Sequence, residues 1–397
     1  MENIKIFSIA STSLAFRGLI NGQIKYIKDC GYNIKMVSNK EGSIDEIEQA
    51  EGVAHITLPI NRNFAPIADL IALYKFYKLF KKEKPLIIHS QSIKANLLSM
   101  VAGKLAGVPI RIQTMAGLIS TMDNSLKSKI YRQVEIITFK FSTNVWPNSI
   151  SSYKYMLDTK MCPKEKMAVI GYGSSNGVNI NLFNKDKIPQ NELEDAKKII
   201  NFDSSNFYFL FLGRIVRDKG IADAVKAFTT LQKKHQHVRL IVAGIYDESA
   251  APLDTETLSA LKNNSAIHFV GKVPSVQPYF TVANCFLFPS YREGFPTVLL
   301  EAGALRCPII CSDIIGNIDM IRHNETGLIF KVKDVNDIEK SMEYSLKNRD
   351  KVKIMADTFY NEIEQNFTHN FVCSKVGQAY DQLVKKHFFK KGVSITI

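Results

Sequence analysis

Two carboxylates flank the expected start of a helix in the second half of the chain, in the run YREGFPTVLLEAGAL. Glu293 directly precedes Gly294-Phe295-Pro296, and Glu301 follows eight positions after Glu293. Proline is tolerated in the first turn of a helix, because its missing N–H would be unpaired there anyway. The free N–H groups at such a helix start favour an anion such as a phosphate.

Two ionised carboxylates would repel a phosphate, so this pair is better suited to the hydroxyls of a sugar or a ribose. Hydroxyls donate hydrogen bonds to ionised acceptors. An exposed acidic helix start would give the same pattern, since glutamate is favoured near the positive end of the helix dipole. On spacing alone, both interpretations stand equally well.

A second group of chemically useful residues follows the apolar segment 207–212. Gly213 and Arg214 come directly after this expected strand, and Lys219 and Gly220 stand where the next helix begins. Strand-to-helix turns are where α/β sheets bind ligands, and Arg with Lys can hold phosphate oxygens. The spacing is not that of an ATPase phosphate loop. The group indicates a diphosphate site, with a surface turn carrying ordinary basic residues as the alternative.

Short apolar segments alternate with amphipathic ones along the whole chain, and the pattern restarts in the second half. This predicts an α/β protein with two doubly wound parallel sheets in series. The first-half strands are expected at 4–10, 34–38, 86–89, 110–115, 144–147 and 167–171, with helices that include 19–30, 67–82 and 94–106. The second-half strands are expected at 207–212, 239–243, 267–270, 285–288, 309–311 and 328–330.

The chain has 397 residues, too many for one ordinary core, so two domains of roughly 150–200 residues are expected. The mostly polar segment 181–191 is the expected linker. We therefore place one domain at 1–183 and the other at 184–370. The C-terminal segment 371–397, amphipathic up to residue 386, is expected to cross back and pack on the first domain.

The net charge of +13 is concentrated in the first half. Residues 1–185 hold 24 Lys and Arg against 13 Asp and Glu, and the remainder holds 27 against 25. This asymmetry suggests that the first half faces an anionic membrane surface or a diphosphate-linked acceptor. We find no nucleic-acid motif with interleaved aromatics and expect no nucleic acid. Alternatively, the positive charge of the first half reflects only a generally basic proteome and no particular partner.

The segment 70–84, LIALYKFYKLFKKEK, combines large apolar residues with five lysines. Basic amphipathic helices can lie on anionic membranes, although a helix that covers the sheet with a solvated basic face fits as well. No apolar run reaches the roughly 18 residues that span a bilayer. The start of the chain reads as a strand, not a signal peptide, and the six cysteines lack a CxxC pair. We expect a cytoplasmic protein, peripheral on the inner face of the membrane, without a metal site.

Five motifs in residues 207–330 carry a family resemblance: GR-x4-KG, VRLIVAG, VGKVPSV, FPSYREGFPTVLLEAGA and NETGL. In this order they resemble the retaining glycosyltransferases of family 4, whose GT-B fold has two Rossmann-like domains facing a cleft. The first half agrees more loosely, through IIHSQSIKANLLSMVAGKLAGVPIRIQT, AGL and VIGYGSSNGVNINLF. These are similar to bacterial members that build capsule, O-antigen and lipid-linked oligosaccharides.

The resemblance implies an enzyme that moves a hexose or an N-acetylhexosamine with retention of configuration. The donor would be a nucleotide-sugar, UDP-linked, and the acceptor a glycan or polyprenyl-diphosphate-linked oligosaccharide of a bacterial surface polysaccharide. The first domain would bind the acceptor and the second the donor. No cofactor and no divalent metal are implied.

The resemblance also implies a role for individual residues. Arg214 and Lys219 would hold the donor diphosphate, Glu301 the ribose hydroxyls, and Glu293 the donor sugar, so that Glu293, Arg214 and Lys219 form the catalytic set. Further donor contacts would come from Gly213, from Val273 beside the base, from Gly18 in a loop over residues 11–18 that closes over the phosphates, and from the backbone around Gly294, Phe295, Pro296 and Thr297.

The first domain departs from the family pattern at one position. Many relatives have a histidine in a T-x-H-G stretch, whereas this chain has Ala116 directly before Gly117. An alanine can neither transfer a proton nor orient a hydroxyl by hydrogen bonding. Gly117 and His89, which ends an expected strand, are the remaining acceptor-side candidates. A lone histidine there is also often a structural residue, so both interpretations of His89 stay open.

Two other functions are compatible with parts of this pattern. A sugar-nucleotide epimerase has the same two-domain architecture, but it needs acid and base residues that are not evident here. A basic, non-enzymatic module that binds membranes or nucleic acid would explain the charge alone.

Overall fold

The computed structural model describes residues 4–61, 65–117, 126–246 and 252–392, and it divides the chain into two compact units. Unit 1 comprises Met1–Gly177 and His369–Ile397, and unit 2 comprises Val178–Thr368. The chain thus passes between the units after residues 177 and 368, whereas its sequence predicts these changes after residues 183 and 370. The expected linker 181–191 lies inside unit 2, where α8 (Gln190–Ile199) begins.

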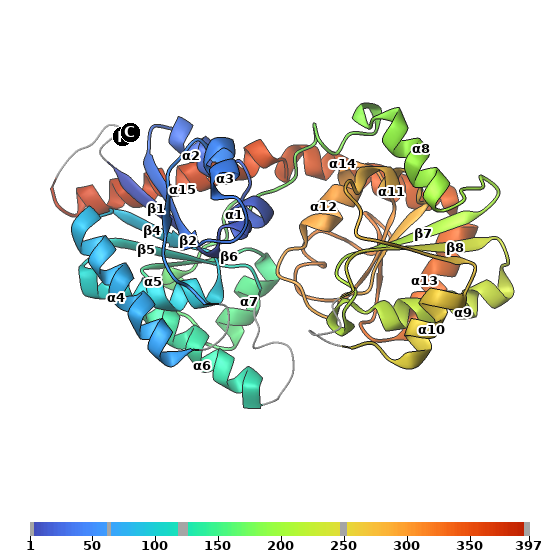
Figure 1. The fold of residues 1–397 in the computed structure, drawn as a ribbon, viewed down its shortest axis with the longest axis horizontal. Coiled ribbons are helices and arrows are strands. Elements are labelled where there is room, and N and C mark those ends of the chain that lie inside the picture. The colour runs from blue at the N-terminus through green and yellow to red at the C-terminus, as the bar shows by residue number, and fades with distance from the viewer. Residues whose placement is uncertain (1–3, 62–64, 118–125, 247–251, 393–397) are drawn as a thin grey trace. The chain divides into compact units, whose positions relative to one another are not determined.

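Unit 1 is built on a sheet of six strands that all pair in parallel, in the order β3-β2-β1-β4-β5-β6 (Figure 1). This is the strand order of doubly wound nucleotide-binding sheets, in which the direction of winding reverses between the first and fourth strands. The strands are β1 (Lys5–Thr12), β2 (Asn33–Asn39), β3 (His55–Thr57), β4 (Ile87–Ser90), β5 (Ile110–Met115) and β6 (Asn144–Pro147).

Helices cover both faces of this sheet. One face packs α4 and α5 against Phe7 and Ile88, and the other packs α2 and α15 against Ile6 and Ile87. Neighbouring strand residues thus point into opposite cores, as the two-residue period of a buried parallel strand requires. The helices are α1 (Leu14–Leu19), α2 (Gln23–Asp29), α3 (Ile44–Glu51), α4 (Pro66–Glu83), α5 (Ile93–Ala106), α6 (Leu126–Phe141), α7 (Ile150–Asp158) and α15 (His369–Phe389).

The sequence predictions for unit 1 were wrong in three places. The expected strand 167–171 forms only one isolated bridge, and Gly171 then takes a left-handed backbone that ends any extension. The edge strand β3 was missed, because it has only three residues. The expected helix 19–30 and loop 11–18 are instead the end of β1, helix α1 and helix α2, with Gly22 at φ +77° separating the two helices.

Unit 2 repeats the same topology. Its six parallel strands have the order β12-β11-β10-β7-β8-β9, which is the order of unit 1 with β7 as the first strand. All six predicted strands are confirmed to within one residue at each end. They are β7 (Phe207–Leu212), β8 (Val238–Ala243), β9 (Ile267–Gly271), β10 (Cys285–Phe288), β11 (Ile309–Ser312) and β12 (Leu328–Phe330).

The central strand β7 is buried on both faces. Tyr208 and Leu210 point into one core of unit 2, while Phe207, Phe209 and Phe211 point into the other. The surrounding helices are α8, α9 (Ile221–Lys234), α10 (Thr255–Asn263), α11 (Gln277–Val282), α12 (Thr297–Ala304), α13 (Val335–Lys347) and α14 (Arg349–Asn366).

The C-terminal helix α15 belongs to unit 1 and runs along its sheet (Figure 1). Tyr380 of this helix is buried, and Asp381 accepts a 2.5 Å hydrogen bond from the hydroxyl of Tyr32. The expected return of the C-terminal segment to the first domain is confirmed up to residue 392. Residues 393–397 of that prediction lie outside the described part of the chain.

Candidate functional site

The two residue groups singled out in the sequence follow neighbouring strands of unit 2. β7 leads into the turn that holds Arg214 and Lys219, and β10 leads into the loop that holds Glu293. These strands pair in parallel, with Phe209 opposite Cys285. They are the two strands between which the winding of the sheet reverses, and open α/β sheets bind ligands at the carboxyl ends of such strands.

The two loops touch through a glycine. Gly220 has φ +71°, and a Cβ added to it would lie 2.0 Å from the carbonyl oxygen of Pro289. No other residue type fits both the backbone conformation and the space. The N–H of Tyr291 also donates to the carbonyl of Asp218 at 2.9 Å, which fixes the register of the loops.

Lys219 and Glu293 form an ion pair across these loops. The Lys219 Nζ lies 2.5 Å from the Glu293 Oε1, with 20% and 15% of the two side chains exposed. The Ser290 hydroxyl donates to the same carboxylate oxygen at 2.7 Å. Glu293 is therefore held in place by a cation and a hydroxyl.

A buried polar network lies behind the Glu293 loop. The Ser312 hydroxyl donates to the Ser290 carbonyl at 2.5 Å, and the Asn317 amide donates to the Ser312 carbonyl at 3.0 Å. Ser290, Ser312 and Asn317 are fully buried. These hydrogen bonds hold the loop in one conformation, although the buried Asn317 Oδ1 has no partner among the described residues. Sequence reasoning missed all three residues, since single serines and asparagines carry no spacing signal.

Helix α12 begins directly after Pro296, which lies just outside its first turn. Pro296 is the N-cap, with φ −73° and ψ 109°, and Thr297 is the first helical residue. The ring of Phe295 packs in the core on Phe367, with the ring centroids 5.7 Å apart. Because its ring is buried in the core, Phe295 can offer a ligand only its backbone.

Glu301 lies within α12 and is partly buried. Burial raises the pKa of its carboxyl to about 7, and no cation of the described residues forms an ion pair with it. A carboxylate that the protein itself leaves without a partner retains its capacity to accept hydrogen bonds from a ligand. Glu293 and Glu301 therefore differ in environment, the first paired and the second not.

The other predicted donor contacts in unit 2 lie at the same sheet edge. Arg214 is exposed, and in the described part of the chain no carboxylate pairs with it. Gly213 directly follows β7 with φ +154°, and a Cβ on Gly244 would lie 1.7 Å from its carbonyl oxygen. Val273 follows β9 and packs partly buried against the core. Arg214 is thus an exposed cation that can bind a ligand, and it lies next to the point where the backbones of Gly213 and Gly244 pack closely together.

His89 of unit 1 is a buried residue with both ring nitrogens engaged. Nδ1 lies 2.6 Å from the Tyr380 hydroxyl, and Nε2 lies 2.7 Å from the Thr114 hydroxyl. Its ring packs edge-on against Trp146 and Tyr380. Burial lowers the pKa of His89 to about 3, so the ring is neutral at pH 7. These contacts favour the structural interpretation of His89.

The two glycines proposed for unit 1 are in different settings. Gly18 is on the exposed side of helix α1, and a Cβ there would meet no atom within 4 Å. Gly117 follows β5 with φ +146° and is the last described residue before 126. Their assigned roles remain predictions.

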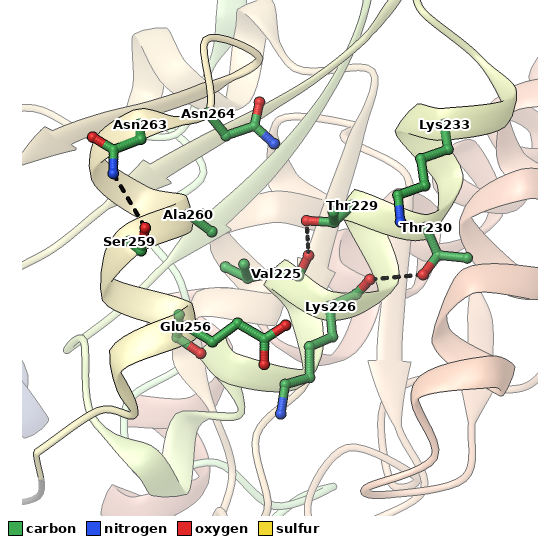
Figure 2. Close-up of a pocket in the computed structure, with 11 residues that line it drawn as sticks. Val225, Lys226, Thr229, Thr230, Lys233, Glu256, Ser259, Ala260, Asn263 and Asn264 are labelled. Atoms are coloured by element: carbon green, nitrogen blue, oxygen red, sulfur yellow. Dashed lines mark hydrogen bonds between the residues drawn. The ribbon is translucent and has the colours of Figure 1, made fainter.

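A wide polar groove in unit 2 lies away from these residues, between α9 and α10 (Figure 2). Its hydroxyls are already used: Thr229 donates to the Val225 carbonyl at 2.8 Å and Thr230 to the Lys226 carbonyl at 3.1 Å (Figure 2). None of the site residues predicted from the sequence lines this groove.

Two family models match the chain. Residues 193–362 match the glycosyl transferases group 1, and residues 8–149 match a glycosyl transferase 4-like domain. Both models describe glycosyltransferases, and the chain is one. Neither model describes an epimerase or a nucleic-acid-binding module, so neither alternative function gains support.

This glycosyltransferase is similar to several known proteins over nearly its full length. It is 29% identical to the capsular polysaccharide biosynthesis glycosyltransferase CapM of Staphylococcus aureus, covering 97% of this chain and 99% of that protein. It is 26% identical to the Escherichia coli UDP-Gal:alpha-D-GlcNAc-diphosphoundecaprenol alpha-1,3-galactosyltransferase, covering 89% and 90%. The Anabaena protein HepE in complex with UDP and glucose has the same GT-B fold, with a TM-score of 0.79, 14% identity and 96% of this chain covered.

Two further observations concern the described residues of this glycosyltransferase. None of their helices combines the length and the apolar character needed to cross a bilayer. Nowhere among them do three His, Cys, Asp or Glu side chains gather as ligands of one metal ion.

Proposed function

We propose that this glycosyltransferase transfers a sugar from a UDP-sugar to a lipid-linked glycan acceptor during bacterial surface polysaccharide synthesis. The observation that carries the proposal is the ion pair of Lys219 with Glu293 at the carboxyl ends of β7 and β10, with the exposed Arg214 in the same turn as Lys219. Relatives named for capsule synthesis and for a diphosphoundecaprenol-linked acceptor support the acceptor class. The complex of HepE with UDP supports the nucleotide.

In this proposal unit 2 holds the donor diphosphate by its cations. Lys219 has three N–H donors, and Glu293 uses one of them, so two remain for phosphate oxygens. Arg214 adds a planar group that can hold two oxygens at once. The N-terminus of α12 adds backbone N–H groups and the positive end of a helix dipole.

The two carboxylates take separate parts of the donor. Glu301 accepts hydrogen bonds from the ribose hydroxyls, which the protein leaves it free to do. Glu293 contacts the transferred sugar while its other role is to orient Lys219 toward the diphosphate. Val273, after β9, lies beside the base.

The chemistry that we propose proceeds with retention and without a divalent metal. The bond between the anomeric carbon and the diphosphate oxygen breaks, and negative charge develops on the leaving diphosphate. Lys219, Arg214 and the helix N-terminus stabilise that charge, which is commonly the largest catalytic contribution in such sites. The acceptor hydroxyl forms the new bond on the same face of the ring, and its proton passes to an oxygen of the leaving phosphate.

The acceptor is assigned to unit 1, and the enzyme to the inner face of the bacterial membrane, where lipid-linked acceptors are held. Incubation with UDP-, GDP- and ADP-sugars and a polyprenyl-diphosphate-linked acceptor tests the proposal. We expect glycosylated lipid with UDP-sugars only, an unchanged rate in EDTA, and an anomeric configuration in the product equal to that of the donor. Donor turnover without a glycosylated product would contradict it.

A further inference from the structure

Helix α4 of unit 1 exposes a continuous stripe that is apolar at one end and basic at the other. Ile67, Leu70, Ile71 and Tyr74 are 80%, 67%, 49% and 55% exposed. These positions recur every three or four residues and so share one face of the helix. The same face continues with exposed lysines: Lys75, Lys78, Lys81 and Lys82.

The acidic residues of α4 are turned away from this stripe and neutralised. Asp69 pairs with Lys94 at 2.6 Å, and only 15% of its side chain is exposed. Glu83 pairs with Lys5 at 2.8 Å and with Lys35 at 3.6 Å. The exposed stripe is therefore uniformly basic beyond its apolar end.

Helix α6 has the same character, which its sequence did not reveal. Leu126, Ile130 and Ile137 are 74%, 56% and 44% exposed, beside the exposed Lys129 and Lys140. Its acidic residue, Glu135, is buried. Of the side chains that the structure describes on α4 and α6, no exposed one is acidic.

The two helices belong to one layer. α4 packs on α5, and α5 packs on α6 (Figure 1). Both α4 and α6 follow a parallel strand, so their first turns lie at the carboxyl edge of the sheet. Their most exposed apolar residues, Ile67 and Leu126, are in those first turns. Apolar residues thus gather at the sheet edge, and on α4 most of the lysines lie further from it.

We propose that α4 and α6 together form the surface by which unit 1 docks on an anionic lipid bilayer. The apolar first turns enter the bilayer surface, and the lysines meet the negatively charged headgroups, as in amphipathic helices that lie in a membrane interface. Since it concerns how a membrane-held acceptor is reached, this inference rests on the proposed function. The inference goes beyond the proposed function because it assigns α6 and the carboxyl edge of the unit 1 sheet to the membrane contact.

Flotation of the full-length protein with phosphatidylglycerol-containing vesicles tests this surface. We expect Ile67→Ser with Leu70→Ser, and separately Leu126→Ser with Ile130→Ser, to lower vesicle affinity about tenfold. Lys78→Glu, Lys81→Glu and Lys82→Glu together are expected to lower it by about 100-fold. The matched control, Ile199→Ser with Ile354→Ser, removes equally exposed apolar residues of unit 2 and should float as wild type.

Three readouts separate this inference from the function on which it rests. Stabilisation by UDP should be unchanged in the α4 and α6 variants, which also shows that they fold. Glycosylation of acceptor in detergent should be unchanged, while glycosylation of acceptor in vesicles falls. If the α6 variant floats as wild type, or if either pair instead abolishes self-association in sedimentation velocity, the surface is not a bilayer-docking site. If wild type floats but shows no transfer at all, the proposed function fails and the surface stands.

Discussion

Lys219 and Glu293, 74 positions apart in the chain, form a 2.5 Å ion pair at the carboxyl ends of the two central strands of unit 2. The pair exists because β7 and β10 are neighbours and because Gly220 lets their loops pack at backbone distance. The structure thus joins two sequence motifs into one candidate donor site.

The Lys219–Glu293 pair predicts coupled losses of activity. Lys219→Ala and Glu293→Gln should each lower kcat about 100-fold, the cost of removing one preorganised charge from such a site. Because Glu293 orients Lys219, the double variant should lose much less than the product of both effects. Steady-state kinetics on the four proteins measures this, with Lys262→Ala as a surface control. Wild-type activity in Glu293→Gln, or simple multiplication of the two losses, would remove the assigned roles.

Glu301 predicts a pH-dependent stability. Its pKa is raised from the ordinary 4.5 to about 7 by burial, so the folded state binds this proton more tightly than the unfolded state. The stabilisation is complete below about pH 4.5 and is lost as the pH rises through 7. Glu301→Gln should therefore have the same Tm as the wild type at pH 5 and a higher Tm at pH 8. At pH 8 its free energy of unfolding should exceed that of the wild type by about 1–3 kcal/mol.

The same substitution, Glu301→Gln, should weaken binding of the nucleotide donor. Loss of an ionised acceptor for the ribose hydroxyls is expected to raise the Kd for UDP about tenfold or more at pH 8. Titration calorimetry of wild type, Glu301→Gln and the exposed-site control Glu256→Gln gives the answer. An unchanged Kd for UDP would leave Glu301 as an acidic helix residue and no more.

Gly220 and Gly18 predict opposite effects of adding one methyl group. Gly220→Ala places a Cβ 2.0 Å from the Pro289 carbonyl, which should cost about 2 kcal/mol or more and separate the two loops. Gly18→Ala meets no atom and should raise stability by up to about 1 kcal/mol, as for glycine in a helix. Thermal unfolding tests both.

The activity of Gly18→Ala then tests the role that the sequence gave to Gly18. A fall in kcat/KM with unchanged or higher Tm would support its place near the donor phosphates. Full activity would mean that this residue does not approach the donor.

Tyr380 and His89 predict a purely structural effect. Tyr380→Phe removes the hydroxyl at 2.6 Å from His89 Nδ1 and leaves a buried polar nitrogen unpaired, at a cost of about 1–3 kcal/mol. The Tm should fall, whereas KM for donor and acceptor should stay unchanged, with the exposed Tyr172→Phe as control. A fall in kcat at temperatures where the variant is fully folded would restore His89 as a functional candidate.

The sequence was most informative where strands are long and apolar. Segments such as 207–212 and 285–288 were placed correctly because both faces of a central parallel strand must be apolar. The three-residue strand β3 and the broken helix around Gly22 were missed, since each depends on long-range pairing or on one backbone angle. The exposed apolar face of α6 was also missed, because a helix sequence does not tell which face the sheet covers.

At the candidate site, the sequence showed which residues could act but not how they are arranged. Glu293 and Lys219 were found from separate motifs, and their ion pair follows only from the strand order of unit 2. The supporting residues Ser290, Ser312 and Asn317 are defined by burial and mutual hydrogen bonds, which no spacing encodes.

The central claim is that Lys219 and Arg214 hold the diphosphate of a uridine nucleotide in unit 2. Thermal unfolding with UDP, with uridine, and without ligand tests it most directly, since a ligand that binds only the native state raises the Tm, and raises it more when its affinity is higher. We predict that UDP but not uridine raises the Tm of the wild type, and that the shift largely disappears in Lys219→Ala with Arg214→Ala. No shift with UDP, or an equal shift in the double variant, would contradict this account.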